Sequence, residues 1–289
     1  MTVIVAVDGG GSRCRLAAFD EFGRPLARAI VDGHASLSRS PEQAWKNIEA
    51  GLAQLQRHLR RGPGWLPDRL MMGLAGSLQE TRREHFLAQL PKTLAHTLVT
   101  DGHAQLLGAS AGRPGVCLAM GTGSVVHWLD DQGKNGMAGG WGFPVGDEGS
   151  GAWLGMRLVQ IYLWHVDGRR QHGSLIDALS ERLGSHVSDI QQWSTQTQAG
   201  VLAQLAPLAF EHAEGGDALA ISLIDECVTQ ACALLSLAPQ QLPVHVVGGI
   251  GERLKDQLAA RLGERLHKAR GDALQGLWQS WADIDGERA

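Results

Sequence analysis

A strand followed by a glycine loop occurs twice in this chain, and this repeat constrains the fold most strongly. The first copy is an apolar run at residues 3–7, followed by Asp-Gly-Gly-Gly-Ser at residues 8–12. The second copy is an apolar run at residues 115–120, followed by Gly-Thr-Gly-Ser at residues 121–124. An apolar run bounded by glycines predicts a buried strand that ends in a tight loop. Two such loops in one chain indicate a duplicated unit.

The segments after the two loops support this duplication. Each loop leads into a further strand-like run that ends in the same turn pattern, at residues 19–24 and 129–134: apolar, Asp, acidic, any residue, Gly, basic. Strands then alternate with helices, which is typical of an α/β fold. We predict two lobes from a duplicated βββαβαβα unit, with the glycine loops facing each other across a cleft. The predicted lobes are residues 1–104, completed by a helix at 270–289, and residues 105–269.

The glycine loops suggest phosphate binding. Successive N–H groups in such a turn form a concave anion site, because glycine lets the backbone approach a ligand closely. Asp8 beside the first loop suits Mg²⁺, which takes one or two carboxylates together with phosphate oxygens. For residues 9–11 alone, a plain glycine-rich turn is an equal alternative. The loop is neither a Walker A motif nor a dinucleotide fingerprint, since no Gly-Lys-Ser/Thr and no helix follow it.

A third glycine loop, at residues 248–251, follows an apolar run at 243–247. The pattern after it predicts a helix from about Glu252, with leucines at 254, 258, 262 and 266 on one face. The N-terminus of such a helix is a suitable place for an anion or for the edge of a nucleotide.

Two further segments carry candidate side chains. Asp101 follows a short strand, where it can act as a general base or cap a helix that begins near Ala104. Residues 139–151 contain a dense glycine loop, which precedes a helix predicted at about 152–165. Asp147 and Glu148 in this loop can complement the helix dipole or bind a sugar, and both readings stay open.

Composition indicates an ordinary globular protein of the cytoplasm. Of 289 residues, 44% are hydrophobic, and the net charge of −4 provides no basic surface for nucleic acid. No apolar run approaches the ~20 residues that span a membrane, and no leader sequence is recognisable. The four cysteines show no metal-binding spacing, so free thiols are expected.

These motifs together resemble known ones. Residues 8–12 resemble the phosphate-1 motif of the actin-like (ribonuclease H-like) ATPase superfamily, residues 121–124 its phosphate-2 motif, and residues 247–250 its adenosine motif. Within that superfamily the whole chain resembles the BadF/BadG/BcrA/BcrD ATPase family, and among its members the bacterial glucosamine and N-acetylglucosamine kinases. The strand end at Asp101 and the loop at 140–150 carry the sugar-kinase part of the resemblance.

The resemblance implies a role for each matching residue. Asp101 would be the general base and would contact the sugar, and Asp8 would hold Mg²⁺. The residues implied to bind ATP are Asp8, Gly10, Gly11, Ser12, Gly121, Thr122, Gly123, Ser124, Gly248 and Gly249. Those implied to bind the amino sugar, besides Asp101, are Ser36, Gly140, Trp141, Gly142 and Asp147.

The implied activity is phosphorylation of the 6-hydroxyl of glucosamine or N-acetylglucosamine by a homodimer. Ser36 and Val125 stand where acetamido-sugar kinases often have Asn. The alternatives are an N-acetylglucosamine-specific kinase, an ATPase that activates a radical enzyme, and a sugar sensor. The activators use cysteines to hold an iron–sulfur cluster, and the four cysteines of this sequence are not grouped in that way. The chain begins directly at its first strand, which leaves no room for the DNA-binding helices of a sensor.

Overall fold

The computed structural model describes residues 2–11, 13–196 and 198–286. Ser12, a predicted phosphate-loop residue, lies outside them. The chain forms two compact units, residues 1–115 with 268–289 and residues 116–267. Each unit is built on a five-stranded sheet with helices.

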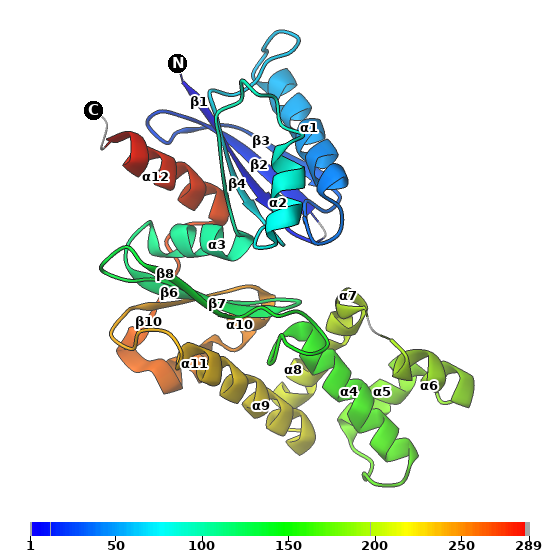
Figure 1. Cartoon of the computed structure of the whole chain (residues 1–289). Coiled ribbons are helices and arrows are strands. Elements are labelled where there is room, and N and C mark those ends of the chain that lie inside the picture. Colours follow the sequence, from blue (N-terminus) through cyan, green and yellow to red (C-terminus); the bar gives the residue numbers. More distant parts are fainter. Residues whose placement is uncertain (1, 12, 197, 287–289) are drawn as a thin grey trace. The chain divides into compact units, whose positions relative to one another are not determined.

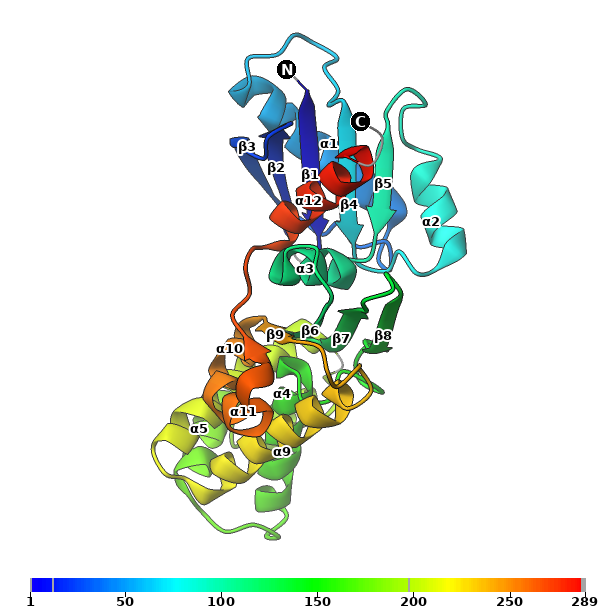
Figure 2. The ribbon, with the colours of Figure 1, turned by 90° about the vertical axis from the view of Figure 1, so that its left-hand side faces the viewer.

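Figure 1 shows the chain coloured along its sequence, and Figure 2 shows the strand order β3-β2-β1-β4-β5 of the first unit from left to right. Strand β1 pairs antiparallel with β2 and parallel with β4, β2 pairs antiparallel with β3, and β4 pairs parallel with β5. The strands are β1 (Val3–Gly9), β2 (Arg13–Asp20), β3 (Pro25–Asp32), β4 (Arg69–Leu74) and β5 (His96–Val99). The helices are α1 (Pro41–His58), α2 (Glu80–Leu87), α3 (Asp101–Ser110) and α12 (Ala273–Gly286).

Strand β1 is buried on both faces, which explains its unbroken apolar sequence. Val5 and Val7 face a core that α1 and α2 complete through Ile48 and Phe86. The alternate residues of β1 face a second core, in which Leu277 of α12 takes part. Figure 2 shows α3 and α12 on one face of this sheet, with α1 on the other.

The second unit repeats this arrangement with the strand order β10-β9-β6-β7-β8. Each of the strands β6–β10 takes the place of the strand five numbers lower, so the predicted duplication and fold class are confirmed. The strands are β6 (Gly115–Met120), β7 (Ser124–Leu129), β8 (Asn135–Gly139), β9 (Val244–Val247) and β10 (Leu266–His267). The helices are α4 (Gly151–Val166), α5 (Ser174–Leu183), α6 (Val187–Ser194), α7 (Ala199–Leu202), α8 (Ala206–Glu214), α9 (Ala218–Leu235), α10 (Gly249–Arg253) and α11 (Lys255–Leu262), with 3₁₀ turns at Ala203–Leu205 and Gly263–Arg265.

The predicted continuous helix after Glu252 is wrong. The chain forms two short helices that are separated at Leu254, and the second ends at Gly263, whose φ is +55°. Leu266 then pairs with Val244 in the parallel ladder of β10 and β9. Sheet pairing at Leu266 therefore overrides the 3.6-residue repeat of leucines that predicted the helix.

Helix α3 begins at Asp101 and not near Ala104. Thr100 is its N-cap, because its hydroxyl accepts a hydrogen bond of 3.0 Å from the backbone N–H of His103. Asp101 therefore lies in the first turn of a helix and not at a strand tip. The predicted lobe boundary between residues 104 and 105 falls inside this helix.

Helix α9 is, by length and composition alone, apolar enough to cross a membrane, and it is the one such helix among the described residues. It contributes Leu223, Ile224, Val228 and other residues to the core of the second unit. The core helix of a globular domain has the same composition, so this helix is weak evidence for a membrane span. Asp217 caps it by accepting hydrogen bonds from the N–H groups of Leu219 and Ala220.

Candidate active site

A buried carboxylate lies at the end of β1, beside the first glycine loop. Asp8 is only 7% exposed and stands directly opposite Arg15 of β2 in the strand register. The Arg15 guanidinium donates a hydrogen bond to Asp8 Oδ2. Burial raises the pKa of Asp8, although the Arg15 charge acts to lower it. Asp8 is therefore an acid at a strand end whose carboxylate is already oriented by a cation.

The first glycine loop is fixed from both sides. The N–H of Gly10 donates to the carbonyl of Arg13 at 3.2 Å, and the Gly10 carbonyl accepts from the N–H of Ala35 at 3.0 Å. Arg39 donates to the carbonyl of Gly11 at 2.9 Å. A Cβ atom added at Gly10 or Gly11 would meet nothing within 4 Å, so open space adjoins this loop. Such a loop can receive a phosphate without first being displaced.

Asp101 belongs to the same unit as Asp8 and is partly exposed. The charge of Asp8 acts on the pKa of Asp101. Burial is the largest cause of the raised pKa of Asp101. The hydrogen bond from the Gly102 N–H lowers this pKa, and the charge of Asp8 raises it. A carboxylate with a raised pKa is a stronger base than a solvated one. The structure thus brings the predicted metal ligand and the predicted base together in one unit.

Ser36 is 5% exposed and follows Ala35, whose N–H bonds to Gly10 of the first glycine loop. It follows β3, and the next residue, Leu37, donates its N–H to the carbonyl of Ala75 at 2.8 Å. The segment is therefore packed against the end of β4. Its predicted contact with a sugar stays a prediction.

In the second unit the Gly121–Ser124 loop is held against the start of α4. The N–H groups of Gly151 and Ala152 donate to the carbonyls of Gly121 and Thr122 at 2.8 and 3.1 Å. Gly248, at the end of β9, has a φ of +94°, and a Cβ atom there would lie 2.3 Å from the Met120 carbonyl oxygen. Glycine is required at position 248, because only then can the ends of β6 and β9 approach so closely.

A cavity of about 410 Å³ opens between these elements. Gly121 and Thr122 line one part of it and Gly249 another, so the predicted phosphate-2 and adenosine motifs share one cavity. Its remaining wall is mainly apolar and includes Ala206, Pro207, Phe210, Ile250 and Arg253. A concave, mostly apolar cavity with few polar groups is typical of a small-molecule site.

Asp147 does not cap helix α4. Ser150 does, since its hydroxyl accepts from the N–H of Trp153 at 3.2 Å. Asp147 Oδ1 instead accepts from the N–H of Ser124 at 3.3 Å, and its carboxylate lies directly against Gly123. Burial raises the pKa of Asp147, and the Ser124 N–H acts to lower it. Asp147 thus ties its own loop to the second glycine loop.

The other predicted sugar-binding residues of the second unit lie in an exposed loop. Trp141 is 82% exposed, and Gly140 and Gly142 on either side of it have φ values of +70° and +91°. The N–H of Gly146 closes the loop by donating to the carbonyl of Gly142 at 2.8 Å. The indole is thereby held out from the surface of this unit.

Four site residues were not predicted from the sequence. Arg15 could have been found, because a hairpin through residues 9–12 places positions 8 and 15 opposite each other. No such local pattern marks Arg39, Phe210 and Arg253, because each comes from a segment that is distant in sequence from the rest of its site.

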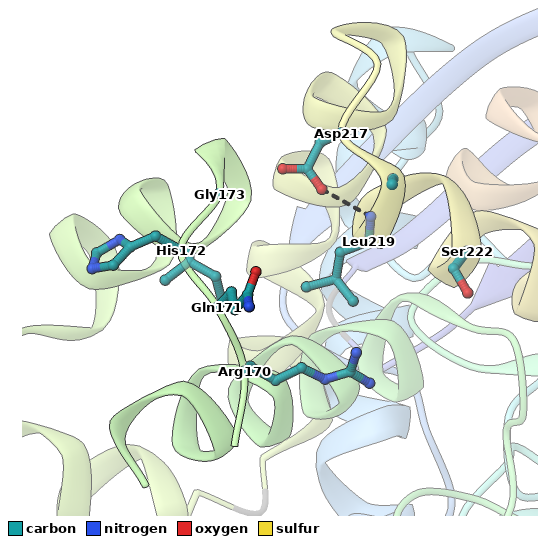
Figure 3. Close-up of a pocket in the computed structure, with 9 residues that line it drawn as sticks. Arg170, Gln171, His172, Gly173, Asp217, Leu219 and Ser222 are labelled. Atoms are coloured by element: carbon teal, nitrogen blue, oxygen red, sulfur yellow. Dashed lines mark hydrogen bonds between the residues drawn. The ribbon is translucent and has the colours of Figure 1, made fainter. Parts of the chain in front are cut away.

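A second cavity of about 480 Å³ in the same unit contains none of the predicted residues. Figure 3 shows Arg170, His172 and Ser222 around it, with the hydrogen bond from Leu219 to Asp217. Asp217 Oδ2 also accepts from Ser174 and from the N–H of Leu175, both at 3.0 Å. This carboxylate therefore satisfies the N-termini of both α5 and α9.

Several known proteins are similar to this chain over nearly its whole length. The chain is 30% identical over 279 residues to the glucosamine kinase GspK of Vibrio cholerae, covering 96% of this chain and 94% of that protein. It is 25% identical to the N-acetyl-D-glucosamine kinase of Dictyostelium discoideum, covering 92% of each chain. A crystal structure from Chromobacterium violaceum, assigned as an N-acetylglucosamine kinase, has a TM-score of 0.88 and 33% identity, with 96% and 98% covered. Residues 5–260 match a family model, and the chain belongs to the BadF/BadG/BcrA/BcrD ATPase family.

Proposed function

We propose that this protein is an ATP-dependent amino-sugar kinase that phosphorylates the 6-hydroxyl of glucosamine. The observation that carries the proposal is the pairing of two features: the acidic site with Asp8 and Asp101 in the first unit, and the cavity that joins Gly121 to Gly249 in the second. The former suits deprotonation of an alcohol, and the latter suits a nucleotide. The glucosamine kinase of Vibrio cholerae, similar over nearly the whole chain, supports the choice of substrate.

In this proposal Asp101 accepts the proton of the sugar hydroxyl as the sugar oxygen attacks the γ-phosphorus. The bond from that phosphorus to the β–γ bridging oxygen breaks, and ADP leaves with this oxygen. Backbone N–H groups of the two glycine loops, those of Gly11, Thr122 and Gly123, bind phosphate oxygens and stabilise the charge that develops on them. Ser36, Gly140, Trp141, Gly142 and Asp147 would orient the sugar. Gly248 and Gly249 would contact the adenosine.

The donors at Asp8 fit a magnesium ion. Mg²⁺ keeps several waters and usually takes one or two carboxylates besides phosphate oxygens, so one buried carboxylate beside a phosphate loop is sufficient. No group of three or more His, Cys, Asp or Glu side chains that could form a closed metal site occurs among the described residues. When bound, Mg²⁺ would neutralise phosphate charge. Asp8 would hold it directly or through water, and Arg15 would keep the carboxylate oriented.

N-acetylglucosamine is the second candidate substrate, because the Chromobacterium structure at 33% identity is assigned to that activity. We place the enzyme in the cytoplasm, a compartment that keeps thiols reduced, because its cysteines are free: Cys14, Cys117 and Cys227 are buried and Cys232 is partly exposed. We further propose a homodimer, which sedimentation at several protein concentrations would test.

The test is an ATP-consumption assay with glucosamine, N-acetylglucosamine, glucose and N-acetylmannosamine, each at the same concentrations. We expect the highest kcat/KM with glucosamine, and ³¹P–¹H correlation in the product should place the phosphate on carbon 6. Preference for the acetylated sugar would favour the second candidate. ATP hydrolysis that no sugar accelerates would contradict the kinase proposal.

A further inference from the structure

The cavity of the second unit contains few groups that could distinguish one purine from another. Among the described residues that line it, Thr122 and Arg253 are those with polar side chains. Thr122 belongs to the glycine loop, and thus to the phosphate end. None of the lining side chains is a carboxylate or a carboxamide, and the carbonyls of α8 are engaged within their helix. The 6-amino group of adenine would therefore find no side-chain acceptor here.

Arg253 is held in a fixed orientation beside this space. Its guanidinium carbon lies 4.5 Å from the centre of the Phe210 ring, and its Nη2 donates to Glu214 Oε1 at 2.9 Å. Phe210 is 4% exposed and so provides a rigid support. A planar guanidinium that covers one aromatic ring can stack on a second ring through its other face. It has five N–H donors and no acceptor.

From these observations we propose that the base is bound by stacking on Arg253, and that the enzyme accepts GTP nearly as well as ATP. This inference rests on the proposed kinase function and adds the class of phosphoryl donor. A guanidinium that is stacked face-on contacts the π-face that adenine and guanine share, and its N–H donors point along its own plane, away from the edge of the base. Large discrimination arises where a site is built to hydrogen-bond a group that the competitor lacks. Such a partner for the adenine amino group is missing from the lining side chains that the structure describes.

The test is calorimetric measurement of Kd for ATP, GTP, CTP and inorganic tripolyphosphate, with Mg²⁺ and without sugar. We expect ATP and GTP to bind within about tenfold of each other, and CTP about tenfold more weakly because its smaller ring stacks less. Arg253→Met should weaken ATP and GTP by about tenfold and leave tripolyphosphate unchanged. Arg261→Met is the matched control, since Arg261 is exposed on α11 and does not line the cavity.

The outcomes separate the two proposals. GTP bound more than about a hundredfold more weakly than ATP would overturn the stacking inference and leave the kinase function intact. Equal weakening of tripolyphosphate by Arg253→Met would also overturn it, because Arg253 would then bind phosphate. Failure of the unaltered protein to bind any nucleotide would contradict the kinase function itself. Arg253→Met leaves no buried unpaired charge, because its partner Glu214 is 73% exposed and its carboxylate stays solvated.

Discussion

The hairpin turn of the first unit and that of the second are built alike. In the first, Asp20 Oδ1 accepts from the N–H groups of Phe22 and Arg24 at 3.0 and 2.9 Å. In the second, Asp130 Oδ1 accepts from those of Gln132 and Lys134 at 3.0 and 2.8 Å. The same strand order surrounds both turns. Duplication has therefore preserved backbone hydrogen bonding even where the sequences differ.

The side chains at the strand ends differ. The strand before the first glycine loop provides Asp8, and the strand before the second ends in Met120. After β5 the chain continues into α3 with Asp101, whereas after β10 it leaves the second unit. The second unit instead surrounds an apolar cavity. In the proposed function one backbone thus carries the acid–base residues in one copy and the binding cavity in the other, and four predictions bear on the two units.

The largest effect should follow from Asp101→Asn. Removing the proposed base should lower kcat by about 10²–10⁴-fold, while nucleotide binding in the second unit should be unchanged. Stopped assays measure turnover and calorimetry measures ATP binding, so the two effects are determined separately. Asp131→Asn, at an exposed position of the second hairpin turn, is the control and should retain full activity. A fully active Asp101→Asn enzyme would show that the base has been misassigned.

Gly248→Ala should destabilise the second unit strongly. The positive φ and the 2.3 Å approach to the Met120 carbonyl leave no room for a methyl group. We expect a loss of about 1–3 kcal/mol in the free energy of unfolding, measured by urea denaturation. At Gly249 an added Cβ meets nothing within 4 Å and φ is not positive, so Gly249→Ala should be close to neutral. Equal stability of both variants would contradict the close approach of β6 and β9.

The raised pKa of Asp101 predicts a pH-dependent stability difference. A carboxylate whose pKa is higher in the folded state than in the unfolded state favours folding when protonated, and this contribution is lost as pH rises through the folded pKa. Asp101→Asn should therefore have a higher Tm than the unaltered protein at neutral pH. The difference should shrink as pH falls through the raised pKa towards the ordinary value of 3.8. A Tm difference that is constant with pH would exclude this cause.

The smallest effects should come from the two turns. Asp130→Ala removes two hydrogen bonds at a partly exposed site and should lower Tm by about 2–4 °C. Asp20→Ala should lower it further, since Asp20 is 1% exposed and also accepts from the Arg24 side chain. The reverse order would show that the two turns support their units differently from what their common hydrogen bonding indicates.

The sequence allowed the duplicated sheets and the glycine loops to be predicted, because apolar runs bounded by glycine are local signals. The start of helix α1 is likewise marked locally: Ser40 caps it by accepting from the N–H of Gln43. Local patterns failed where distant segments decide. Leu266 pairs with Val244 in a sheet, although the residues next to it in sequence indicate a helix. Phe210 contacts Arg253, which lies 43 residues later in the chain.

Asp101 and Asp147 show a subtler limit. Both positions were recognised, but their surroundings depend on backbone N–H groups and charges that no local pattern encodes. Asp147 bonds to Ser124, which lies 23 residues earlier. The pKa of Asp101, in helix α3, responds to the charge of Asp8, in strand β1.

The return of α12 to the first unit has a consequence for biosynthesis. Leu274, Leu277 and Trp281 bury the face of β1 that presents Ile4 and Ala6. During translation this face emerges before the second unit, and it lacks the cover of α12 until the second unit has left the ribosome. The N-terminal half of the nascent chain is thus the last to mature, and the interval exposes it to chaperones or to aggregation.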